Sequence, residues 1–143
     1  MTNVRRRARE VALQILYTAD ISVNAESLEA DVDSLAPGTT AARYCDTLVD
    51  GVSSNKEALD ALIEEYSDNW VVDRMAVVDR NILRIAAWEL KYSGDVPFKV
   101  AIDEAVELAK RYSAEDSSAF INGVLDKMRK GLEQNAGPKR AGM

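Results

Sequence analysis

Apolar side chains recur along most of this chain at the spacing of helices that bury one face. In the first segment they stand three or four residues apart, which places them on one side of a helix. That side is formed by Val4, Ala8, Val11, Ala12, Ile15, Leu16 and Ala19. The same spacing returns in residues 41–52, 58–66, 82–90, 102–109 and 120–132. No alternating apolar and polar run of useful length occurs, so the pattern predicts an all-α fold.

Residues that favour helix ends separate these segments. Thr40 is suited to cap the second segment, and the patterns Ser54–Glu57 and Ser113–Asp116 resemble capping boxes. A polar, acidic stretch follows the first segment, and we expect a short helix in it around Leu28 and Val32. About seven helices are predicted in all.

The segment from Arg80 to Tyr92 is apolar almost all round, which is typical of a helix at the centre of a bundle. Gly94 is suited to a left-handed stop after it, and Pro97 bars its continuation. From about Gln134 onward no apolar stripe continues. We therefore predict a mobile tail over residues 134–143.

Composition narrows the range of functions. The chain has 143 residues, of which 47% are hydrophobic, and only seven Gly and three Pro, which favours a folded domain or two small subdomains. It has no histidine and a single cysteine, Cys45, so an imidazole base, a His-dependent triad, a Cys/His zinc site and an internal disulfide are excluded. Neighbouring carboxylates such as Asp103, Glu104 and Glu107 are interpreted as solvated faces. We expect no enzymatic activity, metal or cofactor.

Charge is segregated along the chain although the net charge is only −6. Residues 1–9 carry four arginines and no acid, and residues 127–143 have a net charge of +4. Residues 20–126 hold nine basic and 22 acidic residues, a net charge of −13. An acidic body with two basic ends indicates that the ends meet a polyanion.

No segment reaches the roughly 18 consecutive apolar residues that a membrane span requires. The N-terminal segment is interrupted by Arg9, Glu10 and Gln14, so it is no signal-peptide core. We therefore expect a cytoplasmic protein without membrane contact.

The arginine cluster is the strongest candidate for chemistry. At about 100° per residue, Arg6, Arg9, Leu13 and Tyr17 would share one exposed face beside the buried stripe. Guanidinium groups bind phosphate bidentately and stack on bases, and an aromatic ring accepts an unpaired base. The alternative is a solvated basic helix start, although cations there oppose the helix dipole. The spacing favours nucleic-acid contact over this alternative.

Two other places remain open from spacing alone. Phe120 fits the apolar stripe of the last segment and is interpreted as a core residue, while Asn122-Gly123 inside a helix indicates close approach by another helix or by a ligand, the helix being the commoner cause. Asp79-Arg80 precedes the central segment, as a cap with an ion pair or as an exposed docking element.

Several strings together resemble the NusB family of bacterial transcription antitermination factors. They are residues 5–10 (RRRARE) with 12–17 (ALQILY), 48–52 (LVDGV), 79–90 (DRNILRIAAWEL), 96–112 (VPFKVAIDEAVELAKRY) and 115–126 (EDSSAFINGVLD). The resemblance spans about residues 4–132, and its last two strings are the most specific.

The resemblance implies an all-α fold of two small helical bundles, here subdomains of about 1–70 and 71–133 within a domain of 1–133. It implies a non-enzymatic factor that binds the boxA element of single-stranded ribosomal RNA leader transcripts together with the ribosomal protein NusE. The pair joins the antitermination complex on RNA polymerase, so that ribosomal RNA operons are fully transcribed. Homodimers and monomers both occur in the family, and both states stay open here.

The resemblance also assigns residues. Those matching the family's two RNA-contacting segments are Arg5, Arg6, Arg7, Arg9, Tyr17, Asp116, Ser117 and Phe120. For Phe120, base stacking thereby becomes as well supported as core packing. Asp79 and Arg80 match the region that meets the ribosomal protein. The residue before Phe120 is often basic in the family but is Ala119 here, which removes one candidate phosphate contact.

Two alternatives remain beside this interpretation. A domain of the same fold precedes some ribosomal RNA cytosine methyltransferases; no such domain follows Leu132, so a stand-alone factor is expected. The other alternative is a helical adaptor that binds only protein, with solvated arginines. Such an adaptor would show no salt-dependent affinity for RNA.

Overall fold

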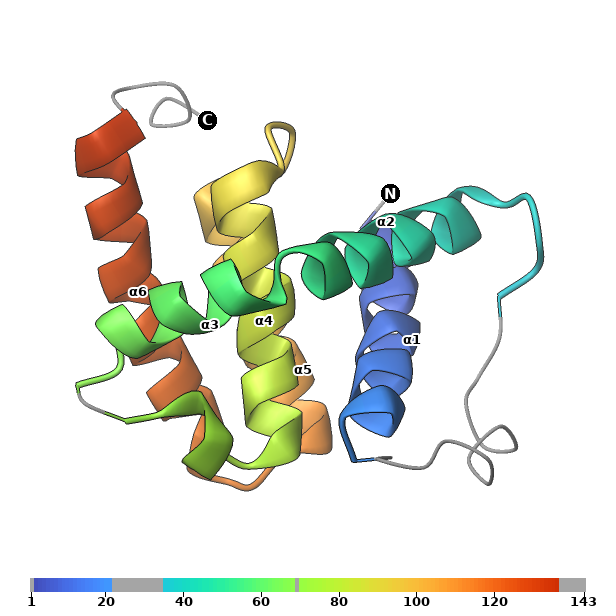
Figure 1. The fold of residues 1–143 in the computed structure, drawn as a ribbon. Helices are drawn as coiled ribbons and strands as arrows, with labels where there is room; N and C mark the ends of the chain where they lie inside the picture. The colour runs from blue at the N-terminus through green and yellow to red at the C-terminus, as the bar shows by residue number, and fades with distance from the viewer. Residues whose placement is uncertain (1, 22–34, 69, 137–143) are drawn as a thin grey trace.

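The computed structural model describes residues 2–21, 35–68 and 70–136. Within these residues the chain forms six α-helices and one short 3-10 helix, and no strand, which confirms the all-α prediction (Figure 1). The short helix expected around Leu28 and Val32 lies outside the described residues, as do residues 137–143 of the predicted tail.

The helices match the predicted segments closely. They are α1 (Thr2–Ile21), α2 (Thr40–Ser54), α3 (Lys56–Glu65), the 3-10 helix η2 (Val72–Arg74), α4 (Val77–Tyr92), α5 (Phe98–Tyr112) and α6 (Ser117–Ala136). The last helix includes residues 134–136, the first three of the predicted mobile tail, because a helix needs no buried face to add a final turn at the surface.

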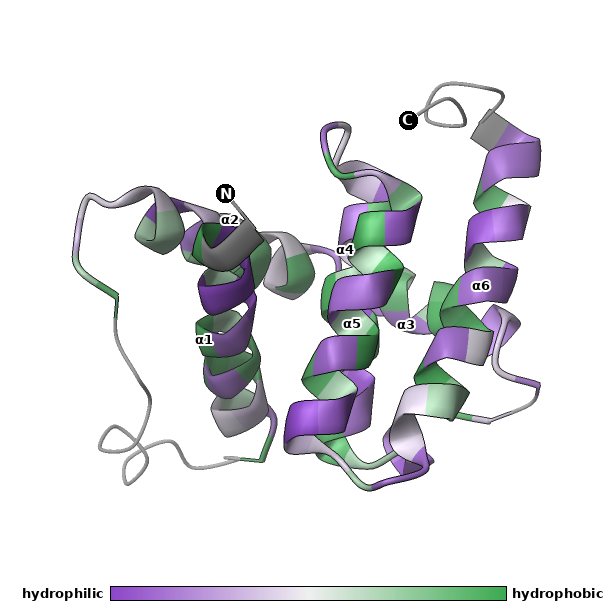
Figure 2. Cartoon of the chain, turned by 180° about the vertical axis from the view of Figure 1, so that it is seen from behind, coloured by the Kyte–Doolittle hydropathy of each residue, from purple (hydrophilic) through white to green (hydrophobic). Residues whose placement is uncertain are grey.

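Helix α4 is the centre of the molecule, as its composition predicted. It packs against α1, α2, α3, α5 and α6. In Figure 1, α1, α4, α5 and α6 stand roughly upright, and α2 and α3 cross them. Seen from behind, α1 and α5 carry both hydrophilic and hydrophobic residues around their circumference, as helices with one solvent side do (Figure 2).

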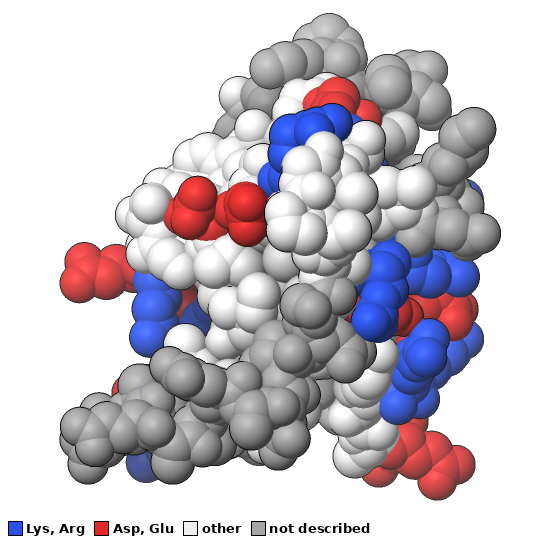
Figure 3. Space-filling view, turned by 90° about the vertical axis from the view of Figure 1, so that its right-hand side faces the viewer, with Lys and Arg blue, Asp and Glu red and all other residues white. Residues whose placement is uncertain are grey.

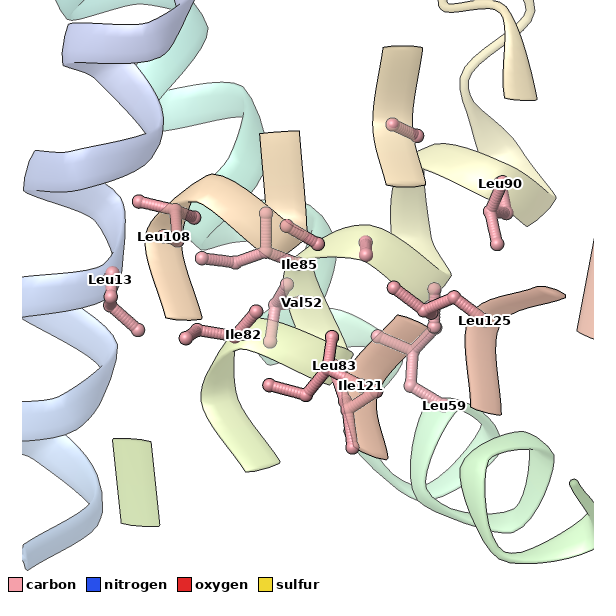
Figure 4. Close-up of a cluster of buried hydrophobic side chains, with 14 of the residues drawn as sticks. Leu13, Val52, Leu59, Ile82, Leu83, Ile85, Leu90, Leu108, Ile121 and Leu125 are labelled. Atoms are coloured by element: carbon pink, nitrogen blue, oxygen red, sulfur yellow. The ribbon is translucent and has the colours of Figure 1, made fainter. Parts of the chain in front are cut away.

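One continuous cluster of apolar side chains fills the space around α4. Ile82, Leu83 and Ile85 lie at its centre and are almost fully buried. Figure 4 shows them meeting side chains from the other five helices, including Leu13, Val52, Leu59, Leu108, Ile121 and Leu125. Burying one such side chain stabilises the fold by about 1.5–3 kcal/mol.

The central helix also buries polar groups, which its apolar pattern did not predict. Asn81, Arg84 and Glu89 are almost fully buried. Arg84 Nε lies 2.7 Å from a carboxylate oxygen of Asp60, and its Nη1 lies 3.0 Å from Asp20. These pairs join α4 to α3 and to the end of α1, because a buried guanidinium needs carboxylate partners.

The predicted helix ends are correct in place but differ in detail. Thr39 rather than Thr40 caps α2, since its hydroxyl accepts from the amide of Ala42 at 3.2 Å. The capping box Ser54–Glu57 does not form: α2 continues through Ser54, and Asn55 makes no side-chain cap bond.

The glycines correct two further expectations. Gly94 does not take the left-handed conformation, since among the described glycines only Gly38 has a positive φ, of 79°. A Cβ at Gly123 would meet nothing within 4 Å, so no helix approaches there. The close approach occurs instead at Gly51, where a Cβ would lie 2.3 Å from Trp88 Nε1, and at Gly131, which packs on Tyr66. Among the described helices, none is both long and apolar enough to cross a membrane.

Candidate nucleic-acid interface

The four arginines at the start of α1 lie in two different environments. Arg5, Arg6 and Arg7 keep 37%, 45% and 42% of their side-chain surface exposed, whereas Arg9 keeps 4%. The predicted exposed face of Arg6, Arg9, Leu13 and Tyr17 is therefore wrong. Arg9 and Leu13 are buried and Tyr17 is partly buried, because α1 packs on both α2 and α4 and its buried arc is wide.

Arg9 belongs to a buried network beneath α1. Its Nε donates to both carboxylate oxygens of Glu89 on α4, at 3.2 and 3.0 Å. The hydroxyl of Tyr44 on α2 donates to the same carboxylate, and the Arg9 guanidinium lies 5.8 Å from the centre of the Tyr44 ring. Burial and the neighbouring Glu89 raise the pKa of Tyr44 well above its ordinary value. This arrangement joins three helices.

The exposed arginines carry acidic partners too. Arg5 Nη2 lies 2.8 Å from Asp95, with its guanidinium 4.5 Å from the centre of the Tyr44 ring. Arg7 Nη1 lies 3.2 Å from Glu10. The hydrogen bond that Arg5 donates to Asp95 raises the pKa of Arg5 and lowers the pKa of Asp95. These pairs offset the mutual repulsion of cations at a helix start.

Arg6 makes a bidentate pair with a buried carboxylate. Its Nε and Nη2 donate to the two oxygens of Glu104 on α5, at 3.0 and 2.7 Å. Glu104 is buried, so its interpretation as a solvated acid is wrong. Figure 3 shows basic side chains lying beside acidic ones on one face of the molecule rather than forming an unbroken basic surface.

The start of α6 contributes an aromatic hollow of about 290 Å³. Phe120 is partly buried at its wall, and Trp70, 54% exposed, meets the Phe120 ring edge-on with centroids 6.3 Å apart. Asp116 is exposed at the same hollow, whereas Ser117 is buried. Spacing did not single out Trp70; the available signal was a large aromatic residue outside every apolar stripe.

A second hollow joins the two predicted RNA-contacting segments. It has a volume of about 560 Å³, and its lining includes Arg6 of α1, Lys110 of α5, and Ala119 and Asn122 of α6. The structure thus brings Arg6 to the start of α6. Tyr17 lines neither this hollow nor the aromatic one.

Asp79 and Arg80 both make contacts within the fold, and the Arg80 side chain stays 15% exposed. Asp79 is buried and accepts hydrogen bonds from the hydroxyls of Ser113 and Ser117, the latter at 2.8 Å. Ser113 thereby tethers α4 and does not form the expected capping box. Arg80 donates twice to Asp20, at 2.8 Å each, which holds the pKa of Asp20 well below its usual range. The ion-pair alternative is the one observed, although Asp79 does not cap α4.

Groups for metal binding do not assemble in the described part of the chain. No cluster of three or more His, Cys, Asp or Glu residues there could hold a metal ion. Cys45 is buried, which raises the pKa of its thiol. Fold and surface together define a small helical binding protein. Its candidate contacts are cationic side chains at one hollow and aromatic side chains at the other.

Comparison with known proteins agrees with this class. The model of the NusB family matches residues 6–130. The transcription antitermination protein NusB of Myxococcus xanthus is 45% identical over 136 residues, covering 91% of this chain and 97% of the relative. The protein of the same name from Bdellovibrio bacteriovorus is 47% identical over 131 residues, covering 88% and 95%.

Solved structures share the fold. That of NusB from T. maritima superposes with a TM-score of 0.77 at 35% identity, covering 88% of this chain and 90% of that one. The structure of antitermination factors NusB and NusE in complex with double-stranded RNA matches with a TM-score of 0.76 at 29% identity, covering 92% and 99%. The chain belongs to the NusB family, a family of transcription antitermination factors and not of enzymes.

Proposed function

We propose that this antitermination factor binds boxA-containing single-stranded RNA with Arg5, Arg6 and Arg7 of α1 and with the start of α6. One observation carries the proposal: Arg6 shares a hollow with Ala119 and Asn122. The aromatic hollow of Trp70 and Phe120 lies on the same first turn of α6. One strand of RNA could then place phosphates on the guanidinium groups and a base beside Phe120.

The partner is proposed to be the ribosomal protein NusE. A structural neighbour at 29% identity was solved with NusE and RNA, which supports both partners for this chain. Asp79 and Arg80 are the residues proposed to meet NusE. Because Asp79 is buried, its part is to hold Ser117 and the start of α6 in place, while the partly exposed Arg80 meets the partner directly.

The assembly is proposed to act on RNA polymerase that transcribes ribosomal RNA operons, in the bacterial cytoplasm. Arg9 has a different part in it. Its side chain is enclosed by Glu89 and Tyr44, so it does not contact RNA itself. It shares Glu104 with Arg6 and the Tyr44 ring with Arg5, and thereby supports these two exposed arginines.

Fluorescence anisotropy with a boxA-type RNA and a scrambled control tests the function. Each RNA is titrated with the chain, with and without the ribosomal partner. Tighter binding to boxA that strengthens when the partner is added supports the proposal. Equal, weak binding to both RNAs with the partner present contradicts it.

The second candidate is a helical adaptor that binds only protein. It is favoured by one observation, that the arginines at the start of α1 already have acidic partners in the free chain. The same titration decides between the two functions. An adaptor retains its binding to the ribosomal protein and shows no salt-dependent affinity for RNA.

A further inference from the structure

Glu104 holds an unusual position between two arginines of α1. Its carboxylate accepts two hydrogen bonds from Arg6, at 3.0 and 2.7 Å, while Arg9 Nη1 lies 3.6 Å from the oxygen that accepts the longer one. The Glu104 side chain is 9% exposed, that of Arg6 45% and that of Arg9 4%. The Glu104 carboxylate is thus held in place by the buried Arg9, while its other partner, Arg6, can exchange it for a ligand from solvent.

This geometry makes Arg6 releasable. When its guanidinium turns toward solvent, Glu104 keeps Arg9 as a cationic neighbour, so no isolated buried charge is left behind. Arg9 has no such freedom, because Glu89 and Tyr44 enclose it on the inner side. Both Arg6 and Glu104 line the 560 Å³ hollow, where an incoming phosphate would meet the guanidinium.

We propose that Glu104 competes with an RNA phosphate for the guanidinium of Arg6, and that this intramolecular competition sets the affinity of the chain for RNA. Asp95 acts in the same way, and more weakly, on Arg5. The inference rests on the proposed function. A carboxylate that must be displaced lowers the affinity for every polyanion, so that stable binding requires the additional base contacts at α6.

The electrostatics of Arg6 agree with a competitor at this position. Its hydrogen bonds to Glu104 are the largest cause that raises the pKa of Arg6, whereas Glu107 and Glu10 raise it only through space. Glu107 lies on the same helix and lines the same hollow, but its ion pair is with Lys110, at 3.9 Å. It therefore provides a matched control.

The test compares Glu104→Gln with Glu107→Gln, each in the wild-type chain and in the Arg6→Ala background. Each variant removes one negative charge from the same face of α5. Affinity for a boxA-type RNA is measured by fluorescence anisotropy at fixed salt, and urea unfolding monitored by circular dichroism verifies that each variant is folded.

We expect Glu104→Gln to bind RNA about threefold to fivefold more tightly than the wild type, which is the size of an ion pair with one solvent-exposed partner. Glu107→Gln changes the affinity by less than about twofold, because its pair with Lys110 is long, at 3.9 Å, and both side chains are more than half exposed. In the Arg6→Ala background Glu104→Gln no longer raises the affinity for RNA, because the guanidinium for which Glu104 competes is absent.

Equal gains from Glu104→Gln and Glu107→Gln would overturn the inference, because the effect would then be general charge. A gain that survives in the Arg6→Ala background would overturn it as well. If Glu104→Gln does not fold, Asp95→Asn replaces it: the Asp95 side chain is 70% exposed, so its removal leaves the core intact. This variant must bind more tightly in the wild type and not in an Arg5→Ala background.

The wild-type titration separates the two claims. If the wild type binds boxA-type RNA and Glu104→Gln binds no more tightly, the competitor is excluded and the proposed function stands. If the wild type binds neither RNA, with or without the ribosomal partner, the proposed function and the inference both fail.

Discussion

Arg6 and Arg9 stand three residues apart in one run of arginines, yet the fold uses them in different ways. Arg9 is enclosed by Glu89, Tyr44 and Glu104, whereas Arg6 keeps nearly half of its side chain in solvent. Both make hydrogen bonds to a carboxylate. The difference shows that one basic motif can contain two kinds of arginine. Arg9 holds helices together in the interior, whereas Arg6 is exposed at the surface.

Removing the two guanidinium groups is the strongest way to break this comparison. Arg9→Ala leaves the buried Glu89 without its guanidinium and is expected to lower the free energy of unfolding by about 3–5 kcal/mol. Arg6→Ala is expected to cost about 1 kcal/mol or less. Urea unfolding monitored by circular dichroism measures both. Equal losses would mean that the two arginines are equivalent.

The aromatic hollow tests the second half of the interface. Phe120→Ala is expected to cost about 1–3 kcal/mol of RNA affinity if a base stacks there. Anisotropy titrations per folded molecule give this value, and Trp70→Ala, which removes the exposed ring, is the companion variant. Lost helicity with unchanged affinity would instead make Phe120 a core residue only.

How much of this interface could be predicted depended on the distance in sequence between the partners. Apolar spacing predicted all six α-helices and the central place of α4, because it reports which face each helix buries. It could not place Arg9 in the interior, because Glu89 is 80 positions away along the chain. For the same reason Ser113 looked like a local helix cap, although it donates to Asp79 on α4, as Ser117 also does.

A second part of the interface that apolar spacing could not predict is the hollow between the helices. Arg6 and Asn122 share it only because α1 and α6 both flank α5. The family resemblance supplied the two segments separately. Their joining at one surface, and the place of Trp70 beside Phe120, came from the packing of the helices.

A smaller expected effect is the pH dependence of stability that the ion pair of Asp20 and Arg80 causes. The pKa of Asp20 is held far below its usual range by Arg80, so the folded state keeps this carboxylate ionised in acid where the unfolded chain takes up a proton. The resulting stabilisation, on the order of 1 kcal/mol, is present above about pH 4 and is lost as the pH falls below it.

The variant Asp20→Asn should therefore be less stable than the wild type at neutral pH, and the gap should narrow toward pH 2. Unfolding free energies across this range measure the gap. A constant difference from pH 2 to pH 7 would show that the Asp20–Arg80 pair is not the origin.

The smallest expected effect is a change in the salt dependence of RNA binding when single cations are removed or added. Three exposed arginines that each neutralise one phosphate of single-stranded RNA give a log–log slope of about −2.1, or roughly 18-fold weaker binding between about 50 and 200 mM salt. Arg6→Ala should flatten the slope by about 0.7, and Ala119→Lys, which adds a cation at the same hollow, should steepen it by a similar amount. Unchanged slopes in both would exclude this hollow as a phosphate path.

The central claim is that one surface, from the start of α1 to the start of α6, carries the RNA. Ultraviolet crosslinking of a 4-thiouridine-substituted boxA-type RNA to the chain in complex with the ribosomal partner, read by mass spectrometry, tests it most directly. We expect crosslinks at Phe120 and Trp70. Crosslinks confined to residues outside the start of α1 and outside both hollows would contradict it.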